Sequence, residues 1–139
     1  MDFAKTAILT GGILSFGLAA GHSLFYRVFG WKSDFEKISI LNRKVLYTIH
    51  IFLTIFFLIF GSISILFAAE LSTGKGLAGS ICFGYAFLWI VRLIWQIAYF
   101  KLSEIPHNRN LLFFHYFLIF LFAILSLCYF APLAQRFLS

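Results

Sequence analysis

Residues 45–69 read VLYTIHIFLTIFFLIFGSISILFAA and contain no charged side chain. A helix needs about 20 apolar residues, each adding about 1.5 Å, to cross a hydrocarbon core of about 30 Å. Residues 45–69 are long enough for that crossing. They are also too uniformly apolar for a helix with one face in water. This stretch therefore predicts a transmembrane helix.

Three further apolar runs of similar length flank it, at residues 4–26, 76–100 and 111–133. The chain has 139 residues, 62% of them hydrophobic, so the four runs and their short connections use nearly all of it. Short connections join antiparallel neighbours. We therefore predict an all-α integral membrane protein with one domain, an up-down four-helix transmembrane bundle over residues 1–139. Ser39 and Arg43 favour an early start of the second helix, and Pro132 is expected to end the fourth.

Lysine and arginine gather at the ends of the runs, where they report membrane orientation rather than binding to nucleic acid. The first and third connections carry seven of the eleven basic residues, and the opposite side carries three. The seven are Arg27, Lys32, Lys37, Arg43, Lys44, Lys101 and Arg109, against Lys5, Lys75 and Arg136. The positive-inside rule then predicts both termini on the outer side, with a bacterial cytoplasmic membrane as the expected location. No nucleic-acid partner is expected despite the formal charge of +6.

Polar residues inside the runs recur at helical spacing, so each helix should present them on one stripe. The stripes comprise Ala4, Gly11, Ser15 and His22; Arg43, His50, Thr54, Phe57, Gly61, Ser64 and Ala68; Ile81, Tyr85, Leu88, Arg92, Gln96 and Tyr99; and Asn108, Leu111, His115, Phe122, Ser126 and Tyr129. A guanidinium facing lipid is penalised by about 2.5–3.5 kcal/mol even on a lenient scale. We therefore expect the stripes to face the bundle centre. Cys82 and Cys128 fall off them and are interpreted as inert apolar residues.

Four of these polar residues come from four different helices at one predicted depth. His22, His50, Arg92 and His115 each lie five to nine residues from a cytoplasmic-side basic residue. That separation corresponds to roughly 7–14 Å inside the boundary. Ionisable groups at membrane depth mark functional sites. The cytoplasmic half of the bundle is therefore the predicted site.

Haem b held between His50 and His115 is the leading interpretation, because haem iron takes axial imidazoles from opposite sides. These two histidines lie on oppositely running helices at similar depth. Arg92, Gln96 and Tyr99 are candidates for the propionates, since arginine suits carboxylates. His22 is a candidate substitute ligand or a hydrogen-bond donor to one. The implied role is redox chemistry or cofactor handling, with a membrane redox partner.

Two other interpretations stay open. The three histidines could hold one Zn, Cu or Fe ion, with His50 and His115 as its principal ligands. Alternatively, no cofactor binds, and the chain is a structural or lipid-binding accessory subunit of a larger membrane complex, with Arg92 meeting an anionic lipid.

The sequence has no Ser-His-Asp set, no metalloprotease motif, no nucleotide-binding loop and no Gly-rich phosphate-binding loop. Any enzymatic role would have to come from a bound redox centre. In its size, its four predicted spans and the histidines within them, the chain resembles in general terms small bacterial haem-handling membrane proteins, such as the membrane-bound protoporphyrinogen oxidases. Their first-helix motif does not occur at residues 21–26, so no functional residue is carried over from them.

Overall fold

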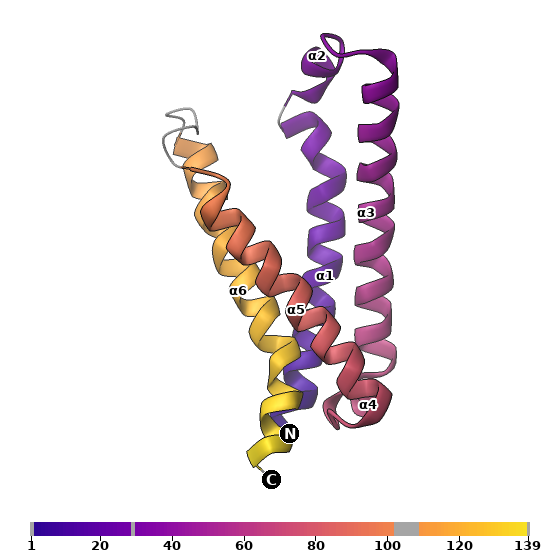
Figure 1. The fold of residues 1–139 in the computed structure, drawn as a ribbon, viewed down its shortest axis with the longest axis vertical. Helices are drawn as coiled ribbons and strands as arrows, with labels where there is room; N and C mark the ends of the chain where they lie inside the picture. Colours follow the sequence, from indigo (N-terminus) through magenta and orange to yellow (C-terminus); the bar gives the residue numbers. More distant parts are fainter. Residues whose placement is uncertain (1, 29, 102–108, 139) are drawn as a thin grey trace. The chain divides into compact units, whose positions relative to one another are not determined.

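The chain folds into helices. A computed structural model describes residues 2–28, 30–101 and 109–138, and over these ranges it contains helices and no strands. Four helices are long, namely α1 (Phe3–Val28), α3 (Ile40–Leu66), α5 (Gly76–Ala98) and α6 (Arg109–Leu138); two are short, α2 (Trp31–Phe35) and α4 (Ala68–Ser72) (Figure 1). The predicted all-α class is confirmed.

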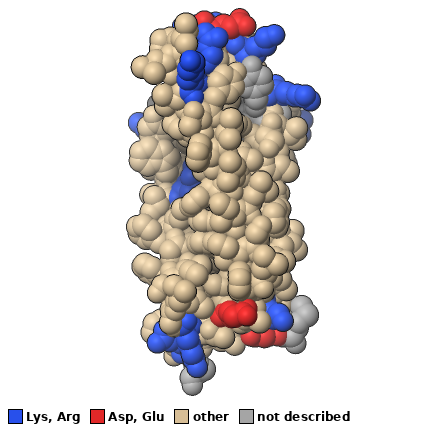
Figure 2. Space-filling model, turned by 90° about the vertical axis from the view of Figure 1, so that its right-hand side faces the viewer, with Lys and Arg blue, Asp and Glu red and all other residues tan. Residues whose placement is uncertain are grey.

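All four long helices are long and apolar enough to cross a membrane. They contain 23 to 30 residues, which corresponds to about 35–45 Å of helix. Figure 2 shows the charged side chains gathered at the helix ends, with largely uncharged surface between them. The molecule is therefore consistent with a polytopic membrane protein. The single four-helix bundle with up-down order stays a prediction.

The expected end of the fourth helix is wrong, because α6 continues through Pro132 to Leu138. Proline inside an apolar helix is tolerated where neighbouring groups compensate for the lost hydrogen bond. Pro132 is fully buried, and the backbone of Gly74 approaches it so closely that a Cβ there would lie 2.6 Å from the Pro132 carbonyl oxygen. Arg136 Nη1 also donates to the Gly74 carbonyl at 3.4 Å. Packing against the α4–α5 loop thus favours the continued helix.

The chain divides into two compact units, which we call the central unit (Gly12–Leu66) and the terminal unit (Met1–Gly11 with Phe67–Ser139). In the central unit, α1 and α3 run antiparallel and side by side (Figure 1). Gly12 and Gly61 permit their close approach. A Cβ on Gly61 would lie 3.1 Å from the Gly12 carbonyl oxygen, and one on Gly12 would lie 3.3 Å from that of Gly61. Small residues at such a contact let helix backbones pack tightly.

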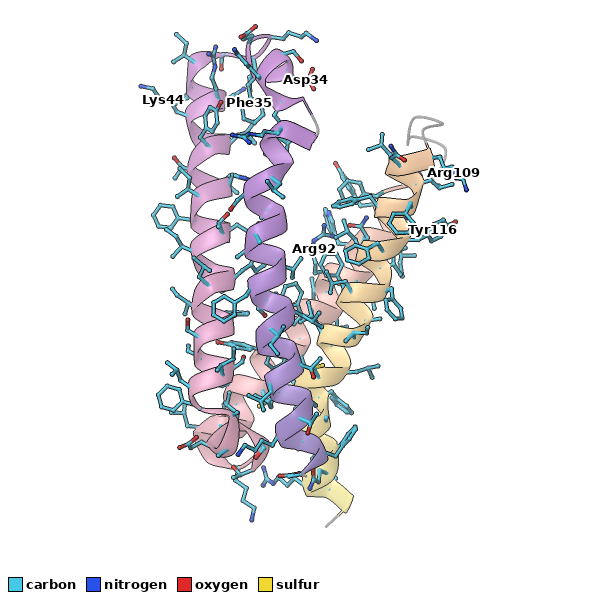
Figure 3. All side chains as sticks on the ribbon, turned by 180° about the vertical axis from the view of Figure 1, so that it is seen from behind. Asp34, Phe35, Lys44, Arg92, Arg109 and Tyr116 are labelled. Atoms are coloured by element: carbon cyan, nitrogen blue, oxygen red, sulfur yellow. The ribbon has the colours of Figure 1, made fainter. Side chains whose placement is uncertain are left out.

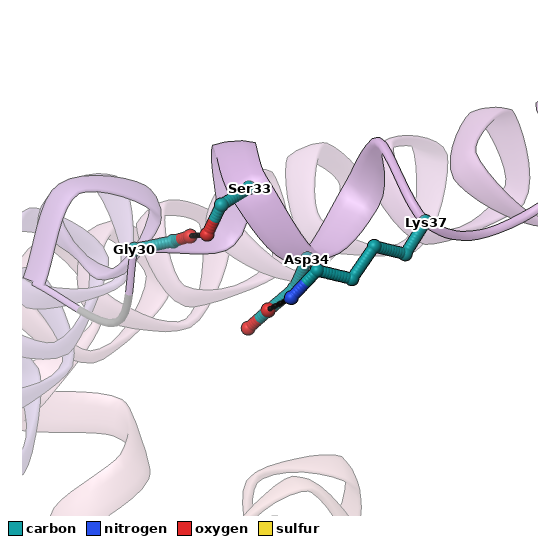
Figure 4. Close-up of polar contacts among 4 residues, drawn as sticks. All are labelled: Gly30, Ser33, Asp34 and Lys37. Atoms are coloured by element: carbon teal, nitrogen blue, oxygen red, sulfur yellow. Dashed lines mark hydrogen bonds and ion pairs between the residues drawn. The ribbon is translucent and has the colours of Figure 1, made fainter.

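The connection between α1 and α3 contains α2, which starts from Gly30 in the left-handed conformation, φ 62°. Glycine adopts this conformation without a Cβ penalty. Ser33 Oγ donates to the Gly30 carbonyl at 2.9 Å, and Lys37 pairs with Asp34 at 3.3 Å (Figure 4). Both members of the ion pair are largely exposed, so it contributes little to stability.

In the terminal unit, α5 and α6 pack antiparallel along their lengths (Figure 1). Trp89 stacks on Phe122 with ring centroids 5.7 Å apart, and Tyr85 meets Tyr129 edge-on at 5.0 Å. Aromatic pairs of this geometry add about 0.5–1.5 kcal/mol beyond area burial. The first turns of α1 join this unit, where a Cβ on Gly11 would lie 3.0 Å from the Tyr129 ring.

The expectation that both cysteines avoid the buried face is wrong. Cys82 is 0% exposed and Cys128 is 7% exposed, and both are free thiols. The buried faces of α5 and α6 are wider than the polar stripes read from the sequence. Cys82 Sγ donates to the carbonyl of Leu71 in α4 at 3.5 Å, a contact that only the folded α4–α5 loop creates.

Candidate functional site

The predicted polar stripes are for the most part buried or half-buried, as expected. Gln96 is 4% exposed and His115 is 6% exposed, and Arg92 is half-buried. Tyr99 is the exception, because it is 61% exposed. α5 ends at Ala98, and the Tyr99 ring stacks on Trp95 with centroids 5.0 Å apart. The expectation that Tyr99 faces inward is therefore wrong.

Two of the predicted histidines meet in the central unit. The imidazoles of His22 and His50 stack with centroids 4.1 Å apart and 23° between their planes, an arrangement we call the histidine pair. Trp31 meets His50 edge-on at 5.1 Å, and Phe57 meets His22 edge-on at 5.6 Å. Aromatic rings from α1, α2 and α3 thus surround the histidine pair.

Helix geometry explains why these two histidines meet. His22 follows Gly12 by ten residues (22 − 12), and His50 precedes Gly61 by eleven (61 − 50). The two helices are antiparallel and touch at Gly12 and Gly61. Ten residues on from Gly12 and eleven residues back from Gly61 therefore lie at the same height, about 15 Å from the glycine contact. The close approach of the two glycines also holds the helices near enough for ring stacking.

Stacking limits what the histidine pair can do as a ligand set. An imidazole nitrogen binds a metal through a lone pair that lies in the ring plane, at about 2.0–2.1 Å. An ion between two nearly parallel rings would sit above both planes instead of in them. The observed arrangement thus lets one imidazole bind a metal while the other supports it by stacking.

Three of the remaining predicted residues lie near one another in the terminal unit, in what we call the Arg92 cluster: Arg92, Gln96 and His115, together with Phe122. Gln96 Nε2 lies 3.0 Å from His115 Nδ1, and the Arg92 guanidinium carbon lies 4.6 Å from the Phe122 ring centroid. Arg92 lies part-way along the α5–α6 pair, below Arg109 and Tyr116 in the view of Figure 3. A guanidinium over an aromatic face gains about 2 kcal/mol when desolvated.

Two polar atoms of this cluster are buried without a hydrogen-bond partner among the described residues, Arg92 Nη1 and Gln96 Oε1. Unsatisfied buried polar atoms cost about 1–3 kcal/mol each, more for charged groups. Native structures contain few of them, and each requires an explanation such as an ion or ligand. The Arg92 cluster therefore has donor and acceptor capacity that its protein neighbours do not use.

The contact between Gln96 and His115 permits two protonation arrangements. When the amide nitrogen donates, His115 Nδ1 accepts and the ring proton lies on Nε2. When the amide is turned over, Oε1 accepts from Nδ1–H and Nε2 carries the lone pair. Only the second arrangement leaves His115 Nε2 able to bind a metal, and it also satisfies Gln96 Oε1.

The structure therefore brings the site residues together in two groups, His22 with His50 and Arg92 with Gln96 and His115. The haem ligation predicted for His50 and His115 combines one residue of each unit, and it stays a prediction. Among the residues that the structure describes, no three His, Cys, Asp or Glu side chains are grouped so that they could hold a metal ion. His107 and Asn108 lie outside the described residues.

Sequence reasoning missed the place of Trp31 beside His50 and that of Trp89 on Phe122. Trp31 follows the first span, where a tryptophan is ordinarily interpreted as an interfacial anchor. A signal was present, because Gly30 turns the chain back directly after α1 and so returns Trp31 toward the helix end. Trp89 follows Tyr85 by one helical turn, so the spacing that predicts burial of Tyr85 also predicts burial of Trp89.

Comparison with protein-family models, with curated proteins and with solved structures found no match for this chain. The four apolar helices are consistent with a polytopic membrane protein.

Proposed function

We propose that this chain is an integral protein of a bacterial cytoplasmic membrane, with four helices crossing the bilayer and both termini outside. Four helices of sufficient length and apolar character support the crossing. The surplus of lysine and arginine in the first and third connections supports the orientation. Lys32, Lys37 and Lys44 at the α1–α2–α3 end are exposed, as charged residues at a membrane surface would be.

We further propose that the polar clusters bind haem b for redox chemistry or haem handling, together with a membrane redox partner or complex. The observation that carries this proposal is His115, a buried span imidazole contacted at Nδ1 by Gln96. With the Gln96 amide turned over, His115 Nδ1–H would donate to Oε1, as the second ring nitrogen of metal-ligating histidines does, and Nε2 would be left for the iron.

The unsatisfied atoms of the Arg92 cluster fit this group. Arg92 Nη1 has hydrogen-bonding capacity for a propionate, and Phe122 offers an aromatic wall. His50, whose ring stacks on that of His22, stays the second histidine proposed to hold the iron. A bound haem would supply one-electron chemistry. The chain's own residues would hold the propionate, fix both imidazoles and exclude water from them.

An absorption spectrum of the purified protein tests this proposal. A reduced-minus-oxidised difference with sharp alpha and Soret bands supports haem b. His50→Ala and His115→Ala should then each abolish the low-spin spectrum, whereas His107→Ala should keep it. A low-spin spectrum retained in either of the first two variants removes that residue as a ligand.

The same preparation distinguishes the alternatives. A colourless protein with stoichiometric Zn, Cu or Fe by elemental analysis supports a mononuclear site instead of haem. A colourless and metal-free protein favours a structural or lipid-binding accessory subunit, for which the unsatisfied Arg92 Nη1 is the favouring observation.

A further inference from the structure

Arg92 is a cation within an apolar span, and the described part of the chain offers it no countercharge. Its recorded contacts are the faces of Phe122 at 4.6 Å and Phe100 at 5.9 Å. The single ion pair recorded among the described residues is Lys37–Asp34, in the α1–α3 connection. A guanidinium at membrane depth is normally paired or faces an aqueous cavity. Cation–π contacts with two rings compensate only part of its desolvation.

Gln96 gives a second and independent indication that a ligand belongs here. Its side chain is 4% exposed and lies one helical turn after Arg92, yet Oε1 has no hydrogen-bond partner among the described residues. With the amide turned over, Oε1 accepts from His115 Nδ1–H and the NH2 group becomes available as a donor. Arg92 and Gln96 would then present adjacent donors to one acceptor-only group.

We propose that Arg92 and Gln96 form a binding site for the carboxylate of an apolar, membrane-soluble molecule, with Phe122 and Phe100 contacting its hydrocarbon part. A guanidinium matches a carboxylate through two parallel hydrogen bonds. Depth favours this ligand over a phosphate headgroup. Arg92 lies six residues before Ala98, the last residue of α5, which is about 9 Å along the helix, and an apolar carboxylic acid reaches that depth more readily than a headgroup. Two sources share this chemistry, a fatty-acid-like molecule and a haem propionate.

The site stands without haem, so its test is independent of the function proposed above. The full chain is placed in nanodiscs of uncharged phosphatidylcholine, and binding of cis-parinaric acid is followed by energy transfer from tryptophan. Its methyl ester keeps the hydrocarbon chain and removes the charge. We expect the acid to bind about tenfold or more tightly than the ester, as loss of a charge-assisted pair predicts.

Arg92→Gln should remove the preference for the acid, Arg92→Lys should retain part of it, and the matched control Arg109→Gln should keep it. Arg109 is an exposed cation at the start of α6 (Figure 3). Equal binding of acid and ester by the unaltered chain overturns the proposal, whether or not the variants fold.

A second comparison identifies the source of the carboxylate. Ferric haem and its dimethyl ester are titrated into the same nanodiscs. A preference for free haem that Arg92→Gln abolishes assigns the site to a propionate. A preference for parinaric acid without haem binding assigns it to a fatty-acid-like ligand, and in that case the anion site stands while the haem proposal fails.

Discussion

The imidazole of His22 lies flat against that of His50, with 4.1 Å between centroids and 23° between planes. The two rings come from helices that run in opposite directions, and the contact between Gly12 and Gly61 sets their separation. Each ring therefore restricts the rotation of the other. The stacking distinguishes two histidines that look equivalent in the sequence, because one metal ion cannot lie in the planes of both rings.

Replacing His22 with phenylalanine should preserve the stack and the bound cofactor. His22→Phe keeps a flat ring, so we expect the absorption spectrum to be unchanged and stability to stay within about 0.5 kcal/mol. His22→Ala should lose the stacking contribution of about 0.5–1.5 kcal/mol in thermal unfolding in detergent. His50→Phe should keep the stack and lose the cofactor spectrum. The reverse pattern, with cofactor lost in His22→Phe and kept in His50→Phe, would exchange the two roles.

A methyl group at the α1–α3 contact should destabilise the protein, whereas one on the open face of α5 should not. A Cβ at Gly61 would lie 2.9 Å from the ring of Phe16 and 3.1 Å from the Gly12 carbonyl oxygen. Overpacking of this kind costs typically about 1–3 kcal/mol. Gly84 is the matched control, because a Cβ there meets nothing within 4 Å. Gly84→Ala should be neutral or gain up to about 1 kcal/mol from helix propensity.

Thermal unfolding of both variants in the same detergent measures this difference. Equal stability of Gly61→Ala and Gly84→Ala would show that α1 and α3 are not in close contact at Gly61. His22→Ala can also be measured in the Gly61→Ala background. If it then lowers the unfolding temperature less than it does in the unaltered chain, the glycine contact and the histidine pair are coupled.

Periodicity and length made the spans and most of the buried stripes predictable. Gln96 and His115 follow from helical spacing together with the penalty for polar groups in lipid, and neither requires knowledge of a neighbour. Pro132 could not be placed in the same way. Its local propensity ends a helix, and only the close backbone of Gly74, 58 residues earlier (132 − 74), reverses that preference.

The arrangement of the site depended on contacts between segments. Depth predicted His22 and His50 at one level, but not their stacking, because ring orientation depends on helix separation and on Trp31. Tyr99 continued the stripe of Gln96 by spacing, yet α5 ends one residue before it. Tyr99 keeps helical backbone angles as the C-cap, φ −89° and ψ −43°, but its ring stacks on the exposed Trp95 ring instead of packing inward.

Gln96 and His115 should stabilise the protein as a pair. Their atoms lie 3.0 Å apart in a buried position, so removing one partner leaves the other unsatisfied. We expect Gln96→Leu to lower stability by about 1–3 kcal/mol, and His115→Leu to do the same. The double variant should be less destabilised than the sum, with a coupling energy of about 0.5–3 kcal/mol in a double-mutant cycle. Strictly additive effects would show that the hydrogen bond contributes nothing to stability.

Single cysteines introduced at the two ends of the helices should report opposite sides of the membrane. Ser33 in α2 and Thr73 after α4 are both exposed, whereas the native Cys82 and Cys128 are buried and should not react in the folded protein. In intact spheroplasts, a membrane-impermeant maleimide should label Thr73→Cys at once and Ser33→Cys only after lysis, because the basic α1–α3 connection is expected in the cytoplasm. The unaltered chain is the control and should be labelled only after denaturation.

Labelling of Ser33→Cys without lysis, with Thr73→Cys protected, would reverse the orientation. It would also place His50 and Arg92 in the outer half of the bilayer, so that any redox partner would have to approach from that side.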